Sequence, residues 1–167
     1  MPNGHTHTKM TLAATIAVGA GAFFVGIPPL QAVAASIGCL TGTILSPDAD
    51  VDGGFLGHNH VRRVFGSVIG KVWEVAWFPY AKLVPHRHPI SHAPVISTII
   101  RLAYVGLWVL LFGWLAWLAF RFDFDWAVIV GVLSSPLFYA FFIGLTVSDT
   151  LHFLADQIST RLGWGRD

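Results

Sequence analysis

The sequence predicts an all-α integral membrane protein: a bundle of about four transmembrane helices with one further amphipathic helix at the membrane surface. Of the 167 residues, 54% are hydrophobic and only 11% are charged, whereas soluble domains carry about 25% charged residues. Long apolar stretches recur along the chain, separated by prolines and short polar segments. The length suits a single domain covering residues 1–167. We therefore expect much of the surface to face lipid.

Four apolar stretches are candidate spans, at residues 11–27, 30–46, 95–120 and 126–147. A spanning helix needs roughly 17–25 apolar residues, so the last two qualify easily and the first two lie near the lower limit. Pro28 and Pro29 end the first stretch because proline lacks the amide donor of a helix, and Pro136 predicts a kink in the fourth. The spans then form two hairpins, whose turns lie on one side of the membrane.

The lysine and arginine residues predict the orientation. The hairpin turns carry Arg121 alone, and Arg101, just inside the third span, is expected to extend toward the opposite, basic side. That side holds the remaining basic residues: Lys9, Arg62, Arg63, Lys71, Lys82, Arg87, Arg161 and Arg166. Because positive charge favours the cytoplasmic side, both termini and the loop 47–94 are predicted to be cytoplasmic.

A second interpretation of the N-terminus stays open. Lys9, the apolar run after it and Ala32-Val33-Ala34 resemble a secretory signal with its cleavage site. The nearly uncharged start and the long apolar run favour an uncleaved span. Cleavage would remove His5 and His7 and change the topology.

The loop 47–94 contains a predicted amphipathic helix at residues 61–80. Its apolar residues recur at helical spacing, and most of its charged residues lie off that face. The apolar set is Val61, Val64, Phe65, Val68, Ile69, Val72, Trp73 and Ala76. This helix either lies in the membrane interface with its basic residues toward anionic lipid or packs on the protein itself.

Histidines and aspartates gather in four clusters that the predicted topology brings to one membrane face. The clusters are His5 with His7; Asp48 with Asp50; His86, Arg87 and His88 with His92; and Asp149, His152 and Asp156. Each has a simpler interpretation as a solvated turn, a terminal tail or a basic loop. The last cluster is the hardest to dismiss, because it follows an apolar span, where unpartnered charge is costly.

The spacing within the clusters suits metal coordination. In an extended segment Asp48 and Asp50 point to the same side, and on a helix His152 and Asp156 share a face. Asp149 lies near that face, but about 10 Å from Asp156 along the axis. Two aspartates at that separation do not readily share one ion, so either one is an outer partner or there are two ions.

Imidazole and carboxylate ligands without thiolates suit zinc, manganese, iron or nickel, and zinc is the first expectation. The lone cysteine, Cys39, rules out a multi-cysteine zinc site and is expected to be a small buried residue. One or two divalent ions per chain are predicted, and a pair would clamp a phosphate or ester oxygen. In that chemistry Asp149 or Asp50 would act as general base, and Arg87 would hold the phosphate.

At these residues the chain resembles a family of uncharacterised bacterial membrane proteins known only as metal-binding. The matching pieces are Pro2 to His7, Ser46 to Asp50, Trp77 to Tyr80, Lys82, Pro85 to Arg87, Ser91-His92 and Asp149…His152…Asp156. That family looks distantly similar to YdjM-like inner-membrane hydrolases and to the zinc phospholipase C and single-strand nuclease enzymes. The resemblance implies a bacterial inner-membrane location and a ligand set of His7, Asp48, Asp50, His86, His92, His152 and Asp156.

The leading functional hypothesis is a metal-dependent hydrolase that acts at the membrane on a phosphoester, either lipid or lipid-linked. The alternative is a non-catalytic metal-binding protein, such as a sensor, store or assembly factor. A transporter or haem protein is disfavoured because the spans contain almost no ligands at mid-membrane depth. Membrane lipid is the expected partner. A net charge of +1 gives no electrostatic case for nucleic acid, and the sequence sets no oligomeric state.

Overall fold

The computed structural model is all-helical and has no strand among the residues that it describes, which are 4–47, 56–84, 93–121 and 125–162. The all-α prediction is therefore confirmed. The helices, in chain order, are α1 (Gly4–Phe24), α2 (Pro29–Thr41), α3 (Leu56–Leu83), α5 (Pro94–Phe120), α6 (Trp126–Leu133) and α7 (Pro136–Leu162).

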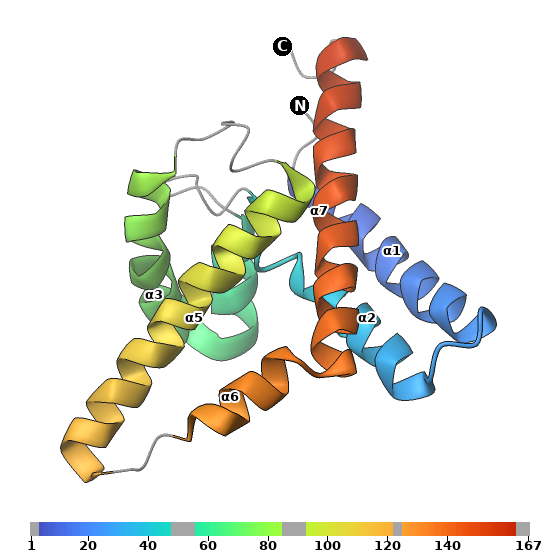
Figure 1. Cartoon of the computed structure of the whole chain (residues 1–167). Coiled ribbons are helices and arrows are strands. Elements are labelled where there is room, and N and C mark those ends of the chain that lie inside the picture. The colour runs from blue at the N-terminus through green and yellow to red at the C-terminus, as the bar shows by residue number, and fades with distance from the viewer. Residues whose placement is uncertain (1–3, 48–55, 85–92, 122–124, 163–167) are drawn as a thin grey trace.

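Helix α7 is the centre of the arrangement, with α1 and α2 on one side and α5 on the other (Figure 1). Its most extensive contact is with α2. Glycine makes this contact close: a Cβ atom at Gly38 would overlap the Phe141 carbonyl, and one at Gly144 would overlap the Ala35 carbonyl. The backbones of α2 and α7 thus touch directly, which fixes the register of α7 against the N-terminal hairpin.

The N-terminal hairpin lies earlier in the sequence than predicted: α1 begins at Gly4 rather than near residue 11, and only α2 is shorter than its predicted span. Helix α1 ends at Phe24, Gly26 adopts a positive φ of 82°, and Pro29 opens α2, in keeping with the preference of proline for the first helical turn. Helix α2 then stops at Thr41 rather than near 46, and Gly42 caps it. Its 13 residues extend about 20 Å, less than the roughly 30 Å of a bilayer core.

The third predicted span is confirmed as a helix, α5, whereas the fourth is divided. Helix α6 ends at Leu133 and α7 begins at Pro136. The Ser135 hydroxyl accepts a hydrogen bond from the Phe138 amide (3.1 Å), as an N-cap residue does. Serine capping and the missing amide of Pro136 therefore start a new helix where the sequence predicts a kink. Helix α7 continues to Leu162, well past the predicted end at 147.

The amphipathic segment is helical, as predicted, but α3 is bent at Gly66. Its C-terminal part packs on α5 through aromatic rings: Tyr104 contacts Trp77 and Tyr80 in tilted arrangements, with ring centroids 5.2 Å apart in both pairs. The Tyr104 hydroxyl also donates to the Ala76 carbonyl. Helix α3 is thus anchored on the protein, yet the apolar side chains around its bend, from Val64 to Val72, remain exposed.

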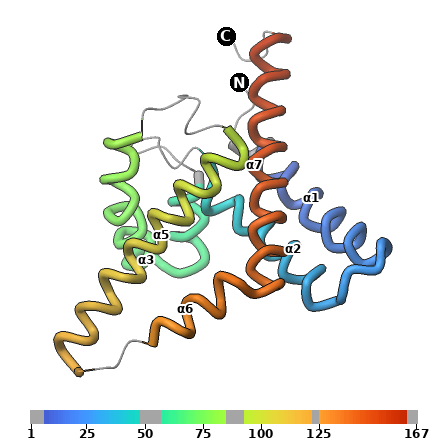
Figure 2. Tube along the Cα trace, in the orientation of Figure 1, coloured from blue at the N-terminus to red at the C-terminus, as the bar shows by residue number. Residues whose placement is uncertain are grey.

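Two helices, α5 and α7, are long and apolar enough to cross a membrane by length and composition; the four-span bundle is not confirmed. In an 18-residue apolar stretch of each helix, only 17% of the stretch in α5 and 28% of that in α7 is buried. Neither helix therefore resembles the core helix of a soluble protein, which is mostly buried. The turn between α1 and α2 and the end of α5 both lie toward the lower end of the molecule, while α7 ends at the upper end (Figures 1 and 2).

Candidate metal centre

Three of the predicted ligands meet where the start of α1 lies against α7. His7 comes from α1, and His152 and Asp156 come from consecutive turns of α7. His7 Nε2 lies 3.1 Å from Asp156 Oδ1, and His152 Nε2 lies 3.4 Å from Asp156 Oδ2. The two imidazole rings stack with centroids 3.9 Å apart. One ligand atom from each residue lies within 4.8 Å of the other two.

The register of the two helices explains this meeting. One turn further along α1, the Thr11 hydroxyl lies 3.3 Å from the hydroxyl of Ser148, one turn earlier on α7. The helices therefore run antiparallel with matched turns, because residues four apart share a helix face. The Cys39 thiol of α2, fully buried as expected, donates to the Thr11 carbonyl at 3.9 Å. Contacts among α1, α2 and α7 thus position the His7 ring against the His152 ring.

The donor set fits a divalent transition metal. Two ligand atoms each about 2.1 Å from a tetrahedral zinc ion lie about 3.4 Å apart. The two His–Asp separations of 3.1 and 3.4 Å are close to that value, each imidazole facing a different oxygen of the Asp156 carboxylate. The side chains of His7 and Asp156 are each only 11% exposed. His7 Nδ1 is buried and has no hydrogen-bond partner among the described residues. The same contacts also suit direct histidine–carboxylate hydrogen bonds.

A buried ion pair lies beside this centre. Asp149, three residues before His152, forms an ion pair with Arg101 of α5, and both side chains are 0% exposed. Thr98 also donates to the same Asp149 oxygen, and Arg101 donates to the Leu45 carbonyl. The prediction that Arg101 extends toward the basic side is therefore wrong. The guanidinium turns inward because a carboxylate and a carbonyl satisfy it there.

The predicted site residues thus fall into three groups. His7, His152 and Asp156 form one cluster. Asp149 is next to it on α7, but one of its carboxylate oxygens is engaged by Arg101 and Thr98. The others lie outside the described residues: Asp48, Asp50, His86, Arg87 and His92.

Sequence reasoning missed the partnership of Arg101 and Thr98 with Asp149 of α7. Ser97, on the same helix as Arg101, contributes its carbonyl, which accepts from Arg101 Nε at 3.2 Å. The signal in the sequence was Arg101, the single charged residue of an otherwise apolar helix. A charge in such a helix needs a partner. Asp149 in the other long apolar helix was the matching carboxylate.

Together these features define a helical protein with a candidate histidine–aspartate metal centre. The chain belongs to DUF2227, a family described as an uncharacterised metal-binding protein, whose sequence pattern matches residues 2–166. No curated protein and no solved structure matches the chain.

Proposed function

We propose that the protein binds a divalent transition-metal ion, zinc first and manganese or iron as alternatives, through His7, His152 and Asp156. The observation that carries this proposal is the convergence of three ligand atoms from two helices within 4.8 Å. Membership of a metal-binding family supports it. Four further residues remain proposed ligands: Asp48, Asp50, His86 and His92. We propose that they provide for a second ion.

We further propose a hydrolase that acts on a phosphoester, lipid or lipid-linked, at the membrane surface. A catalytic zinc ion needs three protein ligands and an open position for water, and the described residues include three candidate ligands. A bound divalent ion would polarise a phosphoryl oxygen and make a water more acidic. We propose in addition a distant likeness to YdjM-like hydrolases and to zinc phospholipase C, because a His-x-x-x-Asp helix of that kind is present here at His152 and Asp156.

The roles of the remaining polar residues follow from their contacts. Asp149 pairs with buried Arg101, which favours a positioning role for this carboxylate on α7. Asp50 is then the proposed general base. Arg87 is the proposed phosphate contact, because a guanidinium can donate two parallel hydrogen bonds to phosphate.

A combined metal and turnover assay separates the hydrolase from a sensor, store or assembly factor. We expect protein purified in detergent to retain about one or two zinc equivalents and to cleave generic phosphodiester or phosphomonoester substrates. We expect turnover to fall at least about 100-fold in His92→Ala, since a metal ligand is lost. Stoichiometric metal without turnover would favour the non-catalytic alternative. Protein that retains no metal and regains none on titration would refute both.

We also propose that α5 and α7 cross the bacterial cytoplasmic membrane. Large apolar side chains on both helices are exposed, among them Leu107 (65%) and Ile143 (58%), and apolar surface on this scale marks a partner or a membrane. Two crossings, like four, return the chain to the side where it started. The lysine and arginine count therefore still predicts cytoplasmic termini.

Reporter fusions test this topology. A C-terminal reporter active only in the cytoplasm is expected to be active, and the protein should resist extraction at alkaline pH. A reporter active only in the periplasm would reverse the orientation. Release by the alkaline wash would refute membrane insertion.

A further inference from the structure

The bend of α3 is built from two glycines. Gly66 has φ 89° and ψ 170°, a conformation that is essentially restricted to glycine. It divides α3 into a first arm, residues 56–65, and a second arm, residues 67–83. In the second arm, Gly70 lies against the first: a Cβ atom there would be 2.8 Å from Arg62 Cα. The two arms therefore cross in direct backbone contact.

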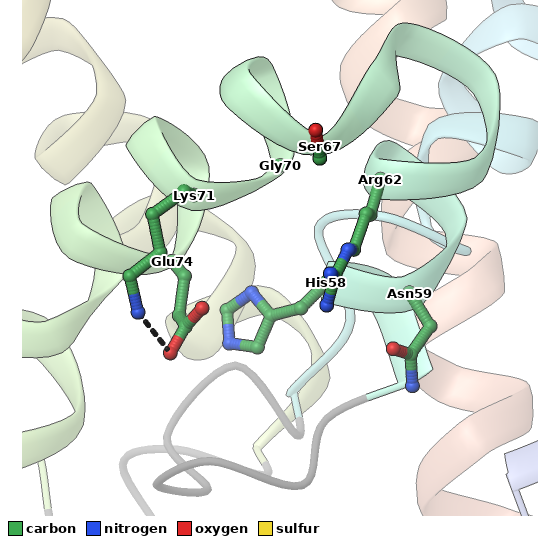
Figure 3. Close-up of a pocket in the computed structure, with 7 residues that line it drawn as sticks. All are labelled: His58, Asn59, Arg62, Ser67, Gly70, Lys71 and Glu74. Atoms are coloured by element: carbon green, nitrogen blue, oxygen red, sulfur yellow. Dashed lines mark hydrogen bonds and ion pairs between the residues drawn. The ribbon is translucent and has the colours of Figure 1, made fainter.

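A polar cavity of about 510 Å³ lies in this bend, within the range of roughly 300–1,000 Å³ of small-molecule sites. Figure 3 shows side chains from both arms around it. The lining residues are His58, Asn59, Arg62, Ser67, Gly70, Lys71 and Glu74. None of them belongs to the metal centre, so this is a separate feature of the molecule.

The charges of the cavity favour an anion. Lys71 Nζ lies 3.1 Å from Glu74 Oε1, as the dashed line in Figure 3 marks, so these two charges offset each other. Among the described residues, no hydrogen bond or ion pair engages the Arg62 guanidinium. Burial lowers the pKa of His58, which keeps its ring neutral at neutral pH. Among the described lining residues, two cations and one anion therefore leave one net positive charge, centred on Arg62.

The hydrogen-bond donors narrow the anion to a phosphate. A guanidinium presents parallel donors that match the oxygens of a phosphate group. The Asn59 amide and the Ser67 hydroxyl line the same cavity and offer further donors. The volume accepts a phosphate together with a small substituent.

The surroundings of the cavity connect it to lipid. Apolar side chains next to it on α3 are exposed, including Val64 (70%), Val68 (76%) and Val72 (62%). An interfacial helix combines such an apolar surface with basic residues at headgroup depth. A phospholipid could thus place its phosphate in the cavity and its acyl chains against these valines, while free phosphate would use the cavity alone.

We propose that the cavity in the bend of α3 binds an anionic phosphate group, with Arg62 as its principal contact. This site requires neither the metal nor hydrolysis, so it goes beyond the proposed function. A failure at one site therefore leaves the other intact.

Binding to the full-length protein in a non-ionic detergent tests the proposal with two probes. One probe is inorganic phosphate, and the other is phosphatidylglycerol mixed into the micelles, with diacylglycerol as the phosphate-free reference. We expect saturable binding that Arg62→Gln weakens about 10-fold, because hydrogen bonds between charged groups are lost. Glu74→Gln should tighten binding, since it removes the carboxylate present among the described lining residues.

Arg63→Gln is the matched control. Arg63 is the next residue on α3, is exposed and does not line the cavity. The affinity of the Arg63→Gln variant for either probe should therefore change less than about twofold. Binding of phosphatidylglycerol alone identifies a lipid headgroup as the ligand, and equal binding of inorganic phosphate identifies free phosphate; both support the site. No saturable binding of either probe, or equal losses in Arg62→Gln and Arg63→Gln, would overturn it.

Discussion

Arg101→Met is expected to destabilise the protein by about 3–5 kcal/mol, which is the usual cost of removing one partner from a buried ion pair. Methionine keeps much of the side-chain volume but leaves the buried Asp149 carboxylate without its counter-ion. The Leu45 carbonyl loses a donor as well. Thermal unfolding in detergent should show a midpoint about 10 °C lower than that of the wild type.

A second variant separates charge from packing. Arg101→Met combined with Asp149→Leu replaces the pair with apolar side chains, which is often neutral for buried ion pairs, so most of the lost stability should return. Arg63→Met, at an exposed position, should change stability by less than about 0.5 kcal/mol. A double variant no more stable than Arg101→Met would show that the ion pair is not what the site requires.

The sequence predicted the helices better than their ends. The prolines at 28 and 29 predicted where α1 ends and α2 begins, because proline acts locally. The ends of α2 and α6 depend on interactions that apolar runs do not reveal. Helix α2 ends within an apolar stretch, where the Gly42 amide bonds to the Cys39 carbonyl three residues back, and Ser135 caps a new helix inside another apolar stretch. Hydropathy averages over such single residues and therefore joins segments that the backbone separates.

The site was predicted where local spacing determines it. His152 and Asp156 share a helix face by their separation of four residues, and no tertiary information is needed for that. That His7 completes the cluster depends on the register of α1 against α7. The close packing of α2 on α7, at Gly38 and at Gly144, helps to set this register, because α1 packs on both helices. The role of Asp149 could not be read from its own helix, because its partner Arg101 lies 48 residues away on α5. Spacing thus identified the carboxylate but not the atom that it contacts.

The three clustered ligands should each be needed for metal affinity. Asp156→Ala removes the carboxylate that contacts both imidazoles, at 3.1 and 3.4 Å. We expect divalent metal to bind at least about 100-fold more weakly, since losing only an outer-shell partner already costs about 10–100-fold. His7→Ala and His152→Ala should have comparable effects. Elemental analysis of the purified variants and competition with a chelator measure both occupancy and affinity.

Loss of metal must be distinguished from loss of fold. A ligand present at 100 times its dissociation constant stabilises the folded state by about 2.7 kcal/mol, so wild type should gain that amount from zinc and Asp156→Ala should gain almost nothing. The metal-free forms should unfold at similar temperatures. His60→Ala, at a half-buried position of α3 outside the cluster, should keep the full zinc-dependent gain. If Asp156→Ala kept it too, the metal would lie elsewhere in the chain. The contact between His7 and Asp156 would then be a hydrogen bond that joins α1 to α7.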